Sequence, residues 1–227
     1  ISTYSLIEAK MNPALIELII LAGIAVFLFL RLRSVLGTRE GFEKPRMQPK
    51  NEAPKRDFKV IDGGEDKDIT DNVEKNSKSA KALKTIKEKD ETFTVNEFLS
   101  GARSAYEWIL MSFEKNEIDD IREILSEEVA EAFDSVVEQR ISQGLTIEAE
   151  FIGVREMKLV DASYNSKTNT AEIAVSFIGE MTSVVKNSSG EIVEGDSKQI
   201  KRQKDTWTFS KDIQSSDPNW LLVATGE

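Results

Sequence analysis

Residues 146–186 read TIEAEFIGVREMKLVDASYNSKTNTAEIAVSFIGEMTSVVK, and this stretch decides the fold. Apolar and polar residues alternate along it, most regularly at Ala171, Ile173, Val175 and Phe177. Alternation with a period of two residues predicts strands with one buried face. The polar runs at 165–169 and 187–190 predict tight turns between them. We therefore expect strands at 146–154, 157–164 and 170–177, the last of them continued at 181–185, in an antiparallel meander.

The segments on either side of this meander complete the predicted domain. Apolar residues before it recur at helical spacing, which predicts a helix over 95–113 capped by Thr94 or Asn96. A short helix at 118–125 follows, and Ser126 then caps a third helix that ends near Gly144. After the meander we expect a brief pairing at 191–194 and strands at 200–210 and 220–225. Helices followed by a meander predict an α+β domain over residues 92–227, with three helices packed on one face of an antiparallel sheet.

An apolar run near the start of the chain predicts a membrane anchor. Residues 14–30 contain one charged side chain, Glu17, and as a helix they would span ~26 Å, close to the ~30 Å of a bilayer core. Arg31, Arg33 and Arg39 follow directly and are the expected membrane-interface residues. The positive-inside rule then places the N-terminus outside and the rest of the chain in the cytoplasm. Because basic residues follow the apolar run, a cleaved signal peptide is the less favoured interpretation.

The chain begins with Ile, and Met11 directly precedes the predicted anchor. We therefore consider Met11 as a possible true start, with residues 1–13 forming only a short N-terminal segment. After the anchor, residues 31–91 are expected to form a basic exit and then a disordered charged linker, because prolines, paired glycines and balanced charge leave little apolar surface. Lysines recur every third residue from Lys75 to Lys87, which favours either attachment to anionic lipid or a solvated lead-in helix.

Composition excludes several classes of function. The 227 residues include neither Cys nor His, so disulfides, Cys-based zinc sites and Ser-His-Asp hydrolysis are excluded. Residues 92–227 carry 13 basic and 25 acidic side chains, which argues against nucleic-acid binding by the domain. Dinucleotide, P-loop and EF-hand motifs are absent from the sequence, so we expect no cofactor and no metal site.

Two separated motifs resemble a known family. The C-terminal motif combines Trp207, Phe209 and the stretch SDPNWLLVATG at 216–226, and the membrane-exit stretch reads LRLRSVLGTREGF at 30–42. With the run FLSGARSAYEWI at 98–109, they are similar to the bacterial, membrane-anchored branch of the Tim44-like domain family, named for the translocase subunit of the mitochondrial inner membrane. The resemblance implies the cone of the nuclear-transport-factor-two-like superfold, in which a curved sheet surrounds helices and leaves an apolar pocket.

The resemblance also implies a function without catalysis. We expect a membrane-tethered interaction or chaperone-like module that aids protein transport or membrane-protein biogenesis at the cytoplasmic face of the inner membrane. Expected partners are membrane lipid, including acidic lipid, client polypeptides, and an insertase or DnaK-type chaperone. Apolar spacing and the aromatic motif predict the residues that line the ligand pocket, although core packing is an alternative role for each: Phe98, Ala102, Tyr106, Ile109, Trp207, Phe209 and Trp220.

A purely structural envelope component or a ligand sensor is one alternative, and two other functions of the same cone are further ones. The first is binding of a lipid or small ligand, and the second is an enzyme that uses a carboxylate base inside the pocket. Asp161 is the candidate base because it is the mid-strand acid that follows Met157 and Leu159 in alternation. An apolar pocket without a buried acid would argue against the enzyme.

Overall fold

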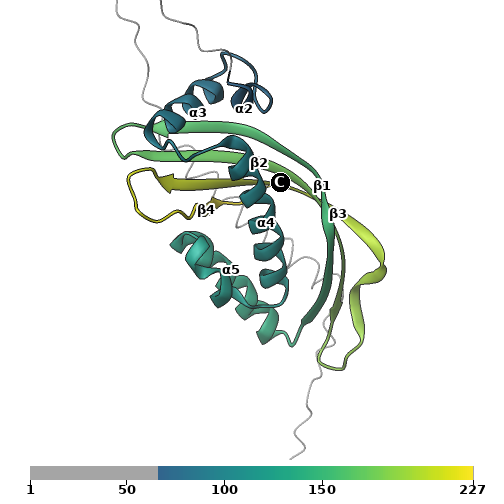
Figure 1. The fold of residues 1–227 in the computed structure, drawn as a ribbon. Coiled ribbons are helices and arrows are strands. Elements are labelled where there is room, and N and C mark those ends of the chain that lie inside the picture. The colour runs from purple at the N-terminus through teal and green to yellow at the C-terminus, as the bar shows by residue number, and fades with distance from the viewer. Residues whose placement is uncertain (1–65, 227) are drawn as a thin grey trace, which may run out of the picture. The chain divides into compact units, whose positions relative to one another are not determined.

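The computed structural model describes residues 66–226, which form one compact unit of helices and a sheet (Figure 1). The predicted anchor at 14–30, the interface residues Arg31, Arg33 and Arg39, and Met11 lie outside the described residues. No helix within residues 66–226 is long and apolar enough to span a membrane. The elements in chain order are α2 (Lys67–Thr70), α3 (Lys78–Lys89), α4 (Val95–Glu114), the 3₁₀ helix η1 (Ile118–Ile124), α5 (Glu127–Ser142), β1 (Thr146–Asn165), β2 (Thr170–Lys186), β3 (Ile192–Asp212) and β4 (Leu221–Ala224).

The sheet is an antiparallel meander with the strand order β1-β2-β3-β4. This confirms the predicted α+β class, with helices packed on a four-stranded antiparallel sheet. The turn at 165–169 is also confirmed, because β1 ends at Asn165 and β2 begins at Thr170. Gly190, in the second predicted turn, has a φ of 79°, a conformation that glycine adopts without strain.

The strands are longer and fewer than the sequence predicts. The two strands predicted at 146–154 and 157–164 are one continuous strand, β1, and those predicted at 191–194 and 200–210 merge into β3. The pairing of β1 with β2 is shifted after Phe151, after Val154 and after Leu159. These bulges interrupt the alternation of apolar residues, so the pattern suggests a strand end where the backbone only bends. The bends also let the long sheet curve around α4 (Figure 1).

The predicted starts of two helices are confirmed, because Thr94 and Ser126 cap them as expected. The hydroxyl of Thr94 accepts a hydrogen bond from the N–H of Glu97 at the start of α4, and that of Ser126 accepts one from Val129 at the start of α5. The second predicted helix is η1, which is a 3₁₀ helix. Its buried residues, Ile118 and Ile121, lie three positions apart, as suits three residues per turn.

The folded unit begins at Asp66, whereas the sequence predicts a disordered linker up to residue 91. Leu83 and Ile86 of α3 are completely buried, and α3 packs on β1. The hydroxyl of Ser79 joins the two elements by donating to the carboxylate of Asp161, and it also accepts from the N–H of Ala162. The sequence allows a solvated lead-in helix here but does not reveal its packing on the sheet, because only one narrow face of α3 is apolar.

Asp68 fixes the start of α4 relative to the preceding helices. Its carboxylate accepts hydrogen bonds from the N–H groups of Val95 and Asn96, at 2.7 and 2.9 Å, and from the ammonium of Lys87 at 3.0 Å. Burial alone would raise the pKa of Asp68, but the bonds from Val95, Lys87 and Asn96 outweigh burial and lower it. This carboxylate therefore positions the helix that carries one wall of the pocket described below.

Candidate functional site

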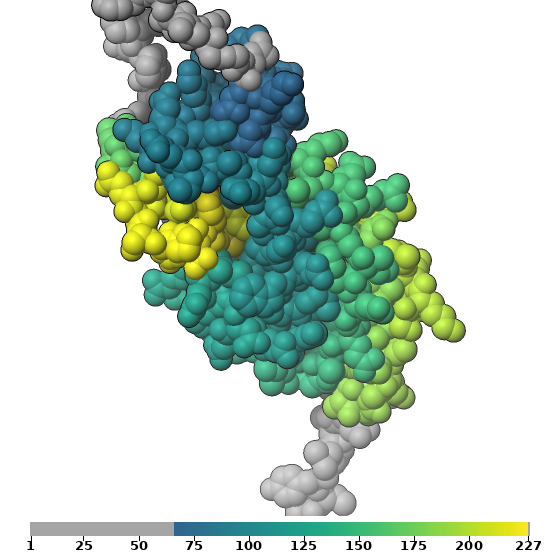
Figure 2. Space-filling model, viewed as in Figure 1, coloured from purple at the N-terminus to yellow at the C-terminus, as the bar shows by residue number. Residues whose placement is uncertain are grey.

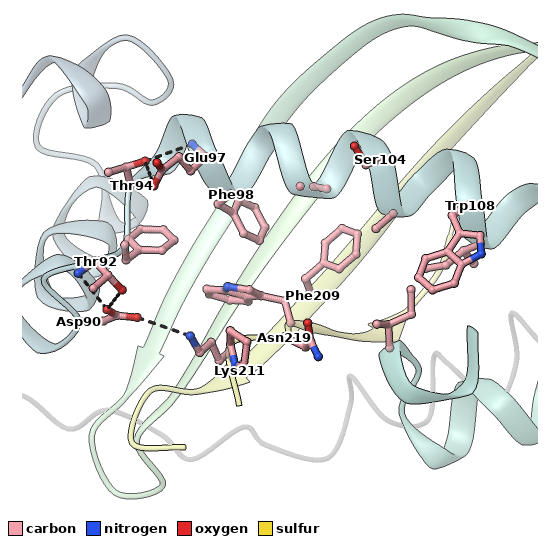
Figure 3. Close-up of a pocket in the computed structure, with 18 residues that line it drawn as sticks. Asp90, Thr92, Thr94, Glu97, Phe98, Ser104, Trp108, Phe209, Lys211 and Asn219 are labelled. Carbon is pink, nitrogen blue, oxygen red and sulfur yellow. Dashed lines mark hydrogen bonds and ion pairs between the residues drawn. The ribbon is translucent and has the colours of Figure 1, made fainter. Parts of the chain in front are cut away.

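A pocket of about 600 Å³ lies between α4 and the segment that joins β3 to β4. One wall is the face of α4 from Thr94 to Ile109, preceded by the turn from Asp90 to Phe93. The other wall carries Phe209 and Lys211 from the end of β3, then Pro218, Asn219 and Trp220, with Ile124 of η1 beyond them. Figure 3 shows Lys211 and Asn219 facing α4 across the pocket.

Aromatic rings build one end of the pocket. The ring of Phe98 lies 4.8 Å from that of Trp220 and 5.9 Å from that of Phe209, measured between centroids, and both pairs meet edge to face. Phe93 completes the cluster at 5.9 Å from Trp220. Phe98 and Phe209 are buried, while Trp220 is half-buried and presents part of its surface to the pocket. Rings in these arrangements attract one another beyond simple burial, so they stabilise the packing at this end of the pocket.

The polar rim at this end is already engaged. The carboxylate of Asp90 accepts hydrogen bonds from the hydroxyl and the N–H of Thr92, and it forms an ion pair with Lys211 at 3.5 Å. The hydroxyl of Thr92 lowers the pKa of Asp90 most, its N–H and Lys211 add to this, and burial opposes them. Asp90 therefore stays ionised and neutralises Lys211, which suits a rim around an apolar site.

The middle of the pocket is lined by small residues and its far end by a tryptophan. Gly101, Ala102, Ser104 and Ala105 form the α4 face here, so little side-chain volume stands between the helix and a ligand. A Cβ atom added at Gly101 would meet no other atom within 4 Å. Trp108 lines the far end and is 49% exposed, which is unusual for the largest apolar side chain. The pocket is therefore an open apolar trough with aromatic residues at both ends.

Five of the seven predicted pocket residues line this pocket: Phe98, Ala102, Ile109, Phe209 and Trp220. Tyr106 of α4 and Trp207 of β3 do not line it, because both side chains are buried in the core between α4 and the sheet. The ring of Tyr106 stacks on that of Phe177 at 4.4 Å and lies 4.7 Å from that of Trp207. Tyr106 is fully buried and Trp207 is 4% exposed, so their role is packing, the alternative that the sequence analysis left open.

The carboxylate proposed for an enzyme is not in the pocket. Asp161 is exposed and bonds to Ser79 of α3. Among residues 66–226 the buried acid is instead Asp205, whose Oδ2 accepts a hydrogen bond of 2.6 Å from the hydroxyl of Tyr106. Burial, followed by the neighbouring Asp205, raises the pKa of Tyr106, so the hydroxyl keeps its proton. Neither member of this pair lines the pocket, and within residues 66–226 no acidic cluster suited to a metal ion occurs.

Sequence reasoning missed Trp108, Gly101 and the ion pair of Asp90 with Lys211. Trp108 carried a usable signal, since it is an aromatic residue outside the apolar stripe that the rest of α4 buries. An aromatic residue outside the buried stripe of a helix lies at its surface, and it indicates a binding surface only together with a hollow lined by its neighbours. Gly101 gave a weaker signal of the same kind, because glycine in the middle of a helix is unfavourable unless space is needed. The ion pair was not predictable, since its members are more than a hundred residues apart.

The fold and its pocket define an α+β domain whose open apolar site lies between one helix and the end of a meander. A model of the Tim44-like domain matches residues 79–227, more than half of the chain, and the chain belongs to this family. Among solved structures, the chain is similar to the crystal structure of the intermembrane space region of the chloroplast protein ARC6, at 9% identity and a TM-score of 0.36, covering 63% of this chain and 94% of that one. No curated protein matches the chain.

Proposed function

We propose that the pocket binds apolar side chains of polypeptides and that the chain is a non-enzymatic, chaperone-like module of protein transport or membrane-protein biogenesis. The observation that carries the proposal is the trough of small residues between the exposed Trp108 and the half-buried Trp220. Exposed apolar surface of this kind is costly unless a partner covers it. The rim supports binding over catalysis, since Asp90 is held by Thr92 and Lys211 and thus is no free base.

The proposal includes a place for the module. The apolar run at 14–30, with Arg31, Arg33 and Arg39 after it, favours a single-pass anchor in the inner membrane with the domain in the cytoplasm. A tether of about 35 residues up to Asp66 would hold the pocket within tens of ångströms of the bilayer and raise its local concentration there. An insertase or DnaK-type chaperone beside the anchor would be the source of clients.

Photo-crosslinking in cells tests this function. A photoreactive residue at Ser104, which lines the pocket and is exposed, should form adducts with many unrelated membrane or exported polypeptides. The matched control is Ser163, an exposed serine of β1 that does not line the pocket. The adducts should decline when residues 11–33 are deleted. Adducts with a single lipid or metabolite, or the same polypeptides at both serines, would overturn the proposal in favour of ligand binding or nonspecific contact.

Acidic lipid is a second proposed partner, through α3. Lys78, Lys81 and Lys84 are exposed on this helix, while its apolar face is buried against the sheet. Lysines near an anionic surface contribute about 1 kcal/mol each. Residues 66–227 should therefore sediment with phosphatidylglycerol vesicles but not with phosphatidylcholine vesicles, and the triple change of these lysines to Gln should abolish the difference. Equal sedimentation of both proteins would exclude α3 as the contact.

A further inference from the structure

The outer edge of β3 is open over the first part of the strand. β4 pairs with β3 only from Thr208 to Ser210, and the N–H of Thr206 donates to the carbonyl of Gly226. Within residues 66–226, no strand pairs with the outer edge of β3 along residues 192–204, and all of these residues are exposed. Figure 1 shows this half of β3 at the right-hand margin of the sheet, away from β4, and Figure 2 shows it as part of the surface.

The backbone groups that face outward can be assigned from the ladder. Successive residues of an antiparallel strand direct their N–H and C=O groups to opposite sides. Thr206 donates outward to Gly226, and the pairing of β3 with β2 is regular from Lys201 onward. Arg202 and Lys204 therefore also direct their backbone groups outward, and together they offer two donors and two acceptors to an added strand.

This open stretch is closed at both ends. At one end Gly226 already bonds to Thr206. At the other end, residues 197–200 bulge out of the ladder with β2, between Asp196 and Lys201. The free edge is thus residues 201–205, about 16 Å long at about 3.3 Å per residue. It has room for a short segment of another chain, whereas a long open edge would invite aggregation.

Basic side chains flank the free edge. Arg202 and Lys204 are exposed and lie on one face of the sheet, paired in register with Glu180 and Ile178 of β2. Oε1 of Glu180 accepts a hydrogen bond of 2.9 Å from Nε of Arg202 and one of 3.3 Å from Arg155 of β1. One carboxylate therefore balances two guanidinium groups, and positive charge remains in excess beside the free edge.

These charges decide which strand can be added. A second copy that paired antiparallel about Gln203 would set Arg202 of each copy against Lys204 of the other, and like charges directly opposite are destabilising. Basic residues on an edge strand oppose self-pairing in this way. A segment with Asp or Glu at alternate positions would instead direct its carboxylates to the basic face, because every second residue of a strand points to the same side.

We propose that the free edge of β3 binds an acidic, extended segment of a partner protein as an added antiparallel strand, with carboxylates at alternate positions. Hydrogen bonds to the backbone of Arg202 and Lys204 supply the affinity, and carboxylates beside the two side chains supply the selectivity. Neither residue lines the pocket, so this docking surface is independent of the proposed function.

Three labelled peptides of nine residues test the proposal. In the first, five Glu alternate with four Thr; the second has Lys in place of Glu; the third is the first with its five central backbone nitrogens methylated, which removes N–H donors and keeps the charge. Fluorescence anisotropy is measured with the full chain in phosphatidylcholine nanodiscs, with empty nanodiscs as the blank. The Glu peptide should bind at least about fivefold more tightly than either of the others.

Each control peptide can overturn one part of the proposal. Equal binding of the methylated peptide would overturn strand addition. Equal or tighter binding of the Lys peptide would overturn the acidic preference. Failure of all three peptides to bind would overturn the docking surface itself.

Lys204→Glu and Lys158→Glu connect binding to the free edge. Lys158 lies on the same face but on β1, with β2 between it and β3, and its side chain is 75% exposed. At about 0.15 M salt, charges more than about 8 Å apart are largely screened, and two strand spacings exceed this distance. Lys204→Glu should therefore weaken the Glu peptide at least about fivefold and strengthen the Lys peptide, while Lys158→Glu changes either by about twofold or less. Equal effects of the two variants would show that binding follows net charge and would overturn the site.

Lys204→Pro and Lys204→Gln separate the backbone from the charge. Both remove the ammonium group, but Pro also removes the outward N–H and leaves the bonds to β2 in place. The Glu peptide should bind about threefold more weakly to the Pro variant than to the Gln variant, and equal affinities of the folded variants would overturn strand addition. If Lys204→Pro does not fold, the methylated peptide decides the same point. A dimer of the full chain, detected by mass photometry and dissociated by excess Glu peptide, would overturn the choice of partner in favour of a second copy.

Discussion

The hydroxyl of Tyr106 donates a hydrogen bond of 2.6 Å to Oδ2 of Asp205, which joins the middle of α4 to β3 across 99 positions of sequence. Gln203 donates to the other oxygen of Asp205 at 3.1 Å, so the carboxylate is held on two sides. The aromatic residues near this hydrogen bond have two different roles. Tyr106 and Trp207 face the core, while Phe98 and Phe209 face the pocket. The hydrogen bond therefore adds to the packing of the buried α4 face in fixing the rotation that presents Gly101 and Trp108 to the trough.

Tyr106→Phe should destabilise the domain by about 1–3 kcal/mol, because Asp205 would remain buried with one partner fewer. Urea unfolding followed by Trp fluorescence measures the change. Tyr164→Phe is the control, since its hydroxyl bonds to Asn169 in the turn between β1 and β2 and is only partly buried. A loss no greater for Tyr106→Phe than for Tyr164→Phe would show that the link contributes little.

Gly179→Ala should be costly for a steric reason that involves the same tyrosine. A Cβ at Gly179 would lie 2.6 Å from the hydroxyl oxygen of Tyr106, and the ring cannot retreat because Phe177 stacks on it. We expect a loss of about 1–3 kcal/mol, whereas Gly153→Ala should be tolerated. A double-mutant cycle tests the cause, because Tyr106→Phe removes the clashing atom and should restore part of the loss. Strict additivity of the two changes would contradict this explanation.

Asp68→Asn should weaken the domain at neutral pH and have little effect in acid. The pKa of Asp68 is lower in the folded chain than its ordinary value of 3.8, so its stabilisation is complete above that value and is lost as the pH falls through the folded pKa. We expect a loss of about 0.5–2 kcal/mol at pH 7, as for a helix cap. Melting temperatures from pH 7 to pH 3 should converge for the two proteins, and Asp71→Asn, at an exposed residue, provides the control. A constant difference over this range would contradict the assignment.

The ion pair between Arg140 and Glu114 predicts unequal effects of its two members. Burial raises the pKa of Glu114 against the opposing effect of Arg140, and burial lowers the pKa of Arg140. Arg140 also donates to the carbonyl of Phe113 and lies 4.3 Å above its ring. Arg140→Met should therefore cost about 1–3 kcal/mol, because it leaves the half-buried Glu114 without its ion-pair partner. Glu114→Gln should cost about 1 kcal/mol or less in the same unfolding assay. A larger loss for Glu114→Gln than for Arg140→Met would show that the carboxylate, and not the guanidinium, holds the end of α4 against α5.

Leu83→Ala tests whether α3 belongs to the folded unit. Leu83 is fully buried, so its truncation should cost about 2–5 kcal/mol. Ala82→Gly, at a half-buried neighbour, should cost about 1 kcal/mol through helix propensity alone. A protein that begins at residue 92 should unfold at a lower temperature than one that begins at residue 66. Equal melting of the two would show that the domain does not need α3.

Much of the fold could be predicted from local patterns. Thr94 and Ser126 each directly precede an apolar periodic run, so their role as helix caps could be predicted from sequence. The turn at 165–169 could also be predicted, because its own residues favour a turn. The sequence does not show that β1 is one continuous strand, because bulges after Phe151 and Val154 break the alternation of apolar residues by which a strand is recognised. The sequence allows a solvated lead-in helix at α3 but does not reveal that this helix belongs to the folded unit, because its burial depends on β1, some 80 residues further along the chain.

The candidate site was predictable in part, for a geometric reason. Periodicity identifies which residues of α4 are apolar, but it cannot tell the core side from the pocket side when both are apolar. Phe98 and Tyr106 are thus equivalent in the sequence, and only the structure separates them. Lys211 lies at the rim of the pocket and pairs with Asp90, and no local sequence pattern predicts an ion pair between residues so far apart in the chain.

The two walls of the pocket are made at different times during synthesis. The α4 wall is complete at Ile109, while the opposite wall waits for Trp220, and at 5–20 residues per second the ribosome needs roughly 6 to 22 seconds to bridge them. During this interval the aromatic face of Phe98 has no partner from the other wall. The nascent chain of this protein therefore exposes apolar surface that a chaperone would have to cover. A product truncated before Trp220 would keep these rings exposed and would be degraded.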